Sequence, residues 1–246
     1  MIIWAGTSSK DVGMVVEHYP SVTIPQKQQE IQQVPGRNGD IVLSTGAYQN
    51  YTQSYQVFLD SKYLGGLETA IPRITDWLMG NEGYQRLEDS YFPGVYRMAY
   101  YAGGAEFVSV FNEYGEGTLT FNCAPEKYYK YGDEPITMTQ GKTLVNPSAF
   151  KAMPKILFDL PTIGGSGTLS VNGETVTLNA GDVSEQGTVT IIIDTKLHKI
   201  YEQESGDSLS YRFSGDYEDL KLGKQSVVTW TGNLQNVRII PRWWTI

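Results

Sequence analysis

Residues 31–43 constrain the fold more than any other stretch of this chain. At their centre stands Asn38-Gly39, the dipeptide that most readily takes the two positive-φ positions of a tight hairpin turn, with apolar runs on both sides. We therefore predict a β-hairpin. Pro35-Gly36 comes just before the turn. Because proline donates no backbone hydrogen bond and glycine packs no side chain, the hairpin should lie at an edge or project from a sheet, where another strand can pair with it.

The rest of the first half combines one helix with several strands. Apolar and polar residues alternate over 51–59, which predicts a half-buried strand. From Leu64 onward the apolar residues fall three or four apart and stop at Gly80-Asn81, which predicts a single helix. Pro72 interrupts this pattern, so we expect either a kinked helix or a helix that begins near Ile71 with Pro72 in its first turn.

The second half is more uniformly β. Asn172-Gly173 separates two alternating runs and predicts the clearest hairpin in the chain. Eight short candidate strands with turn signals between them indicate an antiparallel sandwich or jelly roll. Residues 127–141 are polar and rich in tyrosine, and Asn146-Pro147 follows them. A chain of 246 residues can hold two domains, so we predict an N-terminal domain over 1–140 and a C-terminal domain over 141–246.

The charge and cysteine content exclude several classes of function. The net charge is −8 with no block of lysine or arginine, so no specific nucleic-acid binding is expected. Cys123 is the only cysteine, which rules out an internal disulfide framework and a thiolate metal site. No apolar run reaches the roughly 18 residues that a membrane span requires, so no membrane partner is expected.

The sequence offers no convincing catalytic residues, cofactor site or metal site. His18 and His198 lie in different predicted domains, and neither has a metal-ligand partner nearby. Without a paired histidine, Cys123 and the serines have no base to activate them. The glycines around Arg37 lack the lysine and hydroxyl residue of a phosphate loop. Pairs of acids could serve a glycosidase, but such acids are ordinary in solvated turns; the candidates are Glu202, Glu204, Asp207, Asp216, Glu218 and Asp219.

Three tryptophans near the C-terminus, Trp230, Trp243 and Trp244, suggest a contact surface. Indole rings can stack on sugar rings or on a partner protein. The competing explanation, which we favour, is packing at the edge of the sandwich or between the domains.

Taken together, the motifs resemble one family over essentially the whole chain. The first group is 34–41, 46–51 and the strand that ends at Leu59; the second is the helix ending at Trp77-Leu78, then Gly83-Tyr84, the Tyr96 strand and 117–125; the third is Asn146-Pro147, 171–174, Asp194, Thr231-Gly232 and 237–243. In this order and spacing they resemble the distal tail protein (Dit) family of long-tailed siphophages.

The resemblance implies a mainly β protein with two domains. It implies an N-terminal β-sandwich with one short α-helix and a projecting β-hairpin, which forms a ring of six copies around a central channel, and a C-terminal galectin-like sandwich outside the ring. In this setting the hairpin becomes the candidate for pairing between subunits. Its residues are Val34, Pro35, Gly36, Arg37, Asn38, Gly39 and Asp40.

The resemblance also implies a function. The implied function is that of a non-enzymatic structural virion protein. Such a protein forms a ring-shaped hub at the distal end of a bacteriophage tail, and the hub encloses the DNA channel. The implied partners are further copies in a homo-hexamer or a back-to-back double ring, the tail tube protein, the tape-measure protein, and the tail-tip hub or tail-associated lysin protein. The implied location is the virion tail tip, after assembly in the host cytoplasm. The alternative function is a carbohydrate-binding module that contacts the host cell wall through Trp243, Trp244 and nearby tyrosines.

Overall fold

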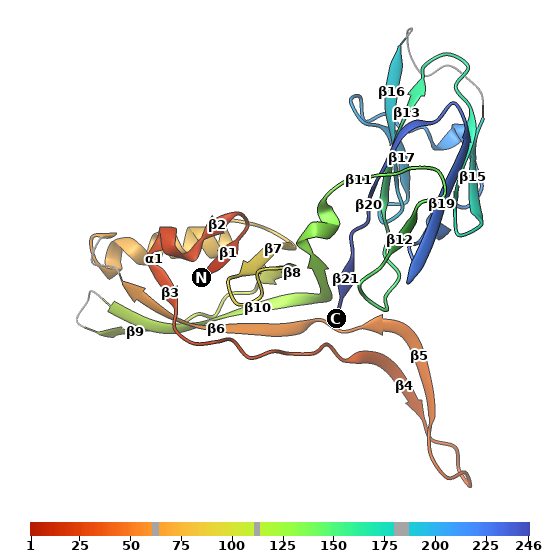
Figure 1. Ribbon diagram of the computed structural model, residues 1–246. Helices are drawn as coiled ribbons and strands as arrows, with labels where there is room; N and C mark the ends of the chain where they lie inside the picture. Colours follow the sequence, from red (N-terminus) through yellow and green to blue (C-terminus); the bar gives the residue numbers. More distant parts are fainter. Residues whose placement is uncertain (61–63, 111–113, 180–186) are drawn as a thin grey trace. The chain divides into compact units, whose positions relative to one another are not determined.

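The chain forms two compact units that are both mainly β (Figure 1). The computed structural model describes residues 1–60, 64–110, 114–179 and 187–246. One unit comprises Met1–Lys127 with Ile246, and the other comprises Tyr128–Thr245. The predicted mainly β fold is confirmed.

The N-terminal unit is built on one large sheet. Its strands follow the order β2 (Thr7–Ser8), β1 (Ile2–Trp4), β7 (Gln85–Asp89), β8 (Val95–Tyr101), β10 (Tyr114–Tyr129), β6 (Tyr51–Asp60) and β3 (Met14–Val16), with β9 (Phe107–Val110) also paired to β10. A short 3-10 helix, η1 (Ser9–Val12), connects β2 to β3. The two ends of this sheet therefore lie only a few residues apart in sequence.

The core of this unit explains why the sheet curls. In β6 every second residue from Tyr51 to Leu59 is buried while the residues between them are not, as the alternation predicted. Trp4 from one end of the sheet and Met14 from the other join Tyr55 in a single apolar cluster. Because strands at opposite ends of the sheet share one core, the sheet must wrap around it.

Helix α1 (Leu67–Met79) covers part of this core with Ala70, Ile74, Trp77 and Leu78. The helix starts four residues before Ile71 and contains Pro72 in its interior, so of the two predicted alternatives the one with a start near Ile71 is wrong. Apolar burial on both sides of Pro72 outweighs the cost of the interior proline. Trp77 fixes the helix to the sheet, since its indole nitrogen donates to the carbonyl oxygens of Trp4 and Thr7, each at 3.3 Å. None of the described helices has the length and apolar character needed to cross a membrane.

The C-terminal unit is a sandwich of two five-stranded sheets, as predicted. One sheet has the order β11 (Ile136–Thr137), β20 (Gln235–Ile240), β13 (Lys155–Pro161), β16 (Thr188–Asp194) and β17 (Lys199–Glu202); the other has β12 (Thr143–Val145), β19 (Gln225–Gly232), β14 (Gly167–Val171), β15 (Glu174–Leu178) and β18 (Phe213–Ser214). Its described residues also form the short 3-10 helices η3 (Lys130–Asp133), η4 (Ser210–Arg212) and η5 (Tyr217–Asp219). Phe158 from the first sheet and Leu169 and Val176 from the second share one core.

The boundary between the units falls at 127/128, earlier than the predicted 140/141. The intervening residues belong to the C-terminal unit. Ile136 pairs with Ile239, and Met138 is buried in the sandwich core. The backbone nitrogen of Tyr129 donates to the carbonyl of Trp243 at 2.9 Å, next to the last strand, β21 (Trp244–Thr245), which pairs with β10. The polar segment that suggested the boundary therefore contains the 3-10 helix η3 and the short edge strand β11.

Candidate functional site

The hairpin predicted around residues 31–43 is the most exposed element of the N-terminal unit. Strands β4 (Lys27–Gln32) and β5 (Ile41–Tyr48) form a two-stranded sheet of their own. We call residues 27–48 the arm (Figure 1). At its base the nitrogen of Gln49 donates to the carbonyl of Gln26 at 2.8 Å. The buried Gln53 amide of β6 donates to the carbonyl of Ser21 at 3.0 Å, which ties the chain before the arm to the main sheet.

The turn at the arm's tip differs from the prediction. The strands end at Gln32 and begin again at Ile41, so the connection is longer than a two-residue turn. The tight turn lies at Pro35-Gly36, where Arg37 N donates to the Val34 carbonyl at 3.1 Å and Gly36 has φ +80°, the values of a type II turn.

The predicted two-residue turn at Asn38-Gly39 is wrong. Gly39 has φ +81°, but Asn38 is not among the residues with positive φ, which a type I′ turn requires at both positions. Proline followed by glycine favours a type II turn. The chain therefore reverses direction at Pro35-Gly36, before it reaches Asn38-Gly39. The loop then continues through Asn38, Gly39 and Asp40 to the start of β5.

Both faces of the arm carry apolar side chains in solvent. Ile31 and Val42 stand opposite each other on one face and are 62% and 53% exposed. Leu43 lies on the other face opposite Glu30 and is 49% exposed. Among the described residues no third strand pairs with β4 or β5. Apolar side chains beside open strand edges are typical of a surface that pairs with another chain.

The three C-terminal tryptophans do not form an exposed platform. Trp243 is 3% exposed and belongs to the sandwich core, which leaves it no surface on which a sugar could stack. Trp244 stacks on Phe150 with ring centroids 4.6 Å apart, and its indole nitrogen donates to the Lys151 carbonyl at 3.0 Å. Trp230 lies half-buried in β19 against the core. The packing explanation accounts for all three positions.

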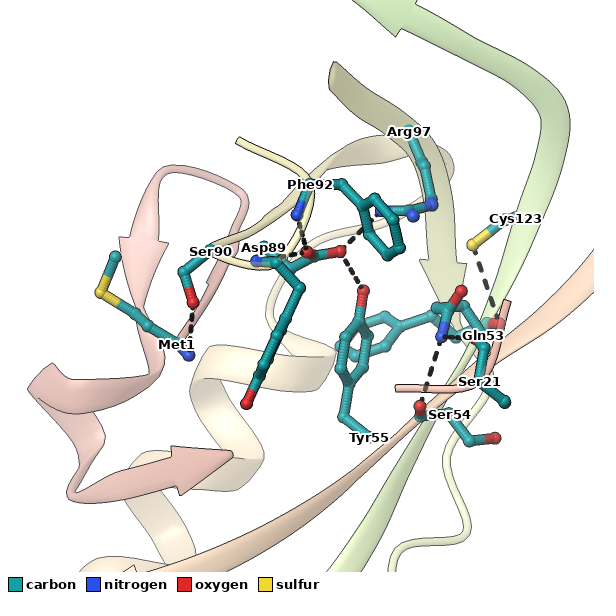
Figure 2. Close-up of polar contacts among 12 residues, drawn as sticks. Met1, Ser21, Gln53, Ser54, Tyr55, Asp89, Ser90, Phe92, Arg97 and Cys123 are labelled. Atoms are coloured by element: carbon teal, nitrogen blue, oxygen red, sulfur yellow. Dashed lines mark hydrogen bonds and ion pairs between the residues drawn. The ribbon is translucent and has the colours of Figure 1, made fainter. Parts of the chain in front are cut away.

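A buried polar network, which the sequence analysis missed, lies inside the N-terminal unit (Figure 2). Arg97 donates to Asp89 at 2.7 Å and to the Tyr51 hydroxyl at 3.1 Å. Tyr55 donates to the same Asp89 oxygen at 3.0 Å, and burial raises the pKa of both tyrosines well above the usual value. The only sequence signal was the spacing of Asp89, which lies two residues after Leu87 in β7 and so points to the same, buried face of the sheet.

Cys123 lies beside this network (Figure 2) in the apolar core of the N-terminal unit. Its side chain has no solvent exposure, and burial raises the pKa of its thiol to about 12. A thiol in this state is a poor nucleophile at neutral pH.

The C-terminal unit contains a second buried ion pair that the sequence analysis missed. Arg242 makes two hydrogen bonds of 2.7 Å to the carboxylate of Asp194. Burial alone would raise the pKa of Asp194, but these bonds from Arg242 hold that pKa below its usual value. Asp194 also accepts the backbone nitrogens of Lys196 and Leu197, which closes the turn after β16. Both features indicate a structural role.

The candidate acids lie in two surface turns, one with Glu202, Glu204 and Asp207 and the other with Asp216, Glu218 and Asp219. His198 pairs with Glu218 at 2.7 Å on the surface, while His18 lies in the N-terminal unit. Within the described ranges no three of these groups are placed to hold a metal ion.

No protein-family model matches the chain. No curated protein matches it either. Among solved structures, the chain is similar to the Dit protein of phage SPP1, described as a paradigm of the hub adsorption apparatus in phages that infect Gram-positive bacteria. The likeness covers 97% of this chain and 96% of that chain, with a TM-score of 0.74 and 13% identity. This chain has the Dit fold.

A second likeness agrees with this assignment. A chain of the phage P2 baseplate in its activated conformation matches with a TM-score of 0.50 and 10% identity, over 92% of this chain and 89% of that one. The Dit resemblance noted from the sequence motifs is therefore confirmed at the level of the fold, across both units.

Proposed function

We propose that this protein is a structural, non-enzymatic hub at the distal end of a bacteriophage tail. The observation that carries the proposal is the near-complete coverage of the SPP1 hub protein, since the likeness spans both units rather than one common sandwich. Location at the virion tail tip, after assembly in the host cytoplasm, is part of the same proposal.

The hub is proposed to be a ring of six copies, alone or as a back-to-back pair. The arm supports this because it offers two open strand edges and exposed apolar side chains, among them Ile31 and Val42. An edge that pairs with the next subunit makes a heterologous contact, and such contacts close into rings when the rotation between subunits allows it.

The proposed ring connects the tail tube and tape-measure proteins on one side to the tail-tip hub or tail-associated lysin on the other, around a channel for DNA. The net charge of −8 supports a conduit. A basic wall would hold phosphates through counterion release, whereas an acidic protein leaves DNA free to move.

The oligomeric state of the purified protein tests this proposal. Light scattering and negative-stain microscopy should reveal hexameric rings or ring pairs. A variant in which a short Gly-Ser linker replaces residues 27–48 should stay folded by circular dichroism but fail to form rings. A matched variant with a Gly-Ser loop in place of residues 33–40, which keeps both strands, should assemble at least in part. A strictly monomeric protein at high concentration and low salt would contradict the proposal.

A further inference from the structure

A groove of about 600 Å³ crosses the outer face of the N-terminal sheet. Its floor is made by outward-facing residues of β6 and β10, where Gln56 pairs with Thr118 and Thr120 follows two residues later. One wall contains Glu17, which the bond from its backbone nitrogen to the Gln56 carbonyl holds beside β6 at 3.0 Å. The other wall contains Glu106 and Val108, before and within β9.

The groove is strongly acidic. Glu17, Glu106 and Glu116 all line it, and none of the three makes an ion pair with a described residue. Among the described residues that line it, His18 is the only basic one. Like charges along one concave surface create a negative potential that attracts a cationic partner. The same potential repels nucleic acid, and the space is far larger than a bare metal ion needs.

The arm tip carries one cationic side chain, Arg37, with Asp40 three residues later. Arg37 lies at the exposed tip, directly after the type II turn, and its side chain makes no ion pair with a described residue. Strand β5 has eight residues, so it carries the tip roughly 26 Å away from its base at a rise of about 3.3 Å per residue. The tip is therefore placed to reach a neighbouring molecule.

We propose that the acidic groove is the docking site for the arm tip of a second copy of this chain. Arg37 of one copy lies among the carboxylates of the next, and the hydroxyl and amide groups of the floor bond to the backbone of the turn. Val34, beside the turn, meets Val108, which is 64% exposed in the groove wall. This inference rests on the proposed ring and names the surface that receives each arm.

A charge exchange tests the contact. Arg37→Glu places a carboxylate among carboxylates, and like charges in contact repel each other. The concentration at which half of the protein is assembled should rise about tenfold or more, as followed by light scattering. Adding Glu106→Arg and Glu116→Arg to Arg37→Glu should restore assembly. The control is Arg73→Glu, because Arg73 is exposed on α1 away from the groove lining; it should leave assembly unchanged.

Cross-linking gives an independent measurement. Cys123 is fully buried, so the native chain should form no disulfide-linked species. A variant with Asn38→Cys and Thr118→Cys should give a ladder of linked copies on a non-reducing gel. The Thr118→Cys variant alone should give at most dimers.

The outcomes separate the two proposals. If rings form but Arg37→Glu assembles normally and the double-cysteine variant gives no ladder, the docking site is overturned while the hub proposal stands. If no rings form, the hub proposal fails, and the ladder alone decides whether the arm tip meets the groove. A loss of assembly that the exchanged charges do not restore would also overturn the assignment of the groove.

Discussion

Arg97 stabilises the curled sheet through its buried ion pair with Asp89. The side chain of Arg97 is 3% exposed and that of Asp89 is fully buried. Removing one partner of such a buried pair leaves the other charge without compensation, which costs about 3–5 kcal/mol. We expect Arg97→Met to lower the free energy of unfolding of the N-terminal unit by that amount, and the loss should be measurable by urea denaturation.

The matched control for this residue is Arg86→Met. Arg86 lies one strand away and pairs with Glu88, but its side chain is 42% exposed. Glu88 is 16% exposed and Arg86 also lies over the Tyr96 ring, but solvent at Arg86 screens this pair more than the Asp89–Arg97 pair, so the control should lose less stability than Arg97→Met. An equal loss in both variants would contradict a special role for burial, and no loss in Arg97→Met would contradict the network itself.

At the scale of elements, α1 contains an unfavourable residue that tertiary packing tolerates. Pro72 lies in the helix interior, where proline removes one backbone hydrogen bond and costs about 3 kcal/mol relative to alanine. Pro72 is exposed, so its ring contributes little to the core. We expect Pro72→Ala to raise the melting temperature of the N-terminal unit. A lower melting temperature would mean that the proline sets a bend on which the packing of Trp77 depends.

The two Asn-Gly pairs show what sequence patterns could and could not predict at this scale. Asn172-Gly173 has φ values of 57° and 93° and joins β14 to β15 directly, as its pattern predicted. Asn38-Gly39 does not form such a turn, because Pro35-Gly36 nearby reverses the chain first. Local patterns thus predicted the strands and the existence of the arm. They could not decide between two adjacent turn signals, nor find Asp89–Arg97, whose partners meet only through the pairing of β7 with β8.

At the scale of the whole molecule, the domain boundary was the least predictable feature. The polar composition of residues 128–140 suggested a domain boundary, yet two apolar residues among them pack through strands about a hundred positions later. Ile136 pairs with Ile239, and Met138 is 5% exposed in the core. Composition cannot reveal such a distant partner.

This difference gives a test of the boundary with two fragments. The fragment 128–246 contains the complete core of the C-terminal unit, so we expect it to fold alone and to unfold in one cooperative transition. The fragment 141–246 lacks Met138 and β11, and the loss of one buried methionine alone costs about 1.5–3 kcal/mol. It should unfold at lower urea concentration and expose Trp243, whose backbone carbonyl has lost its bond from Tyr129. Tryptophan fluorescence measures both effects, and equal stability of the two fragments would place the boundary at 140/141.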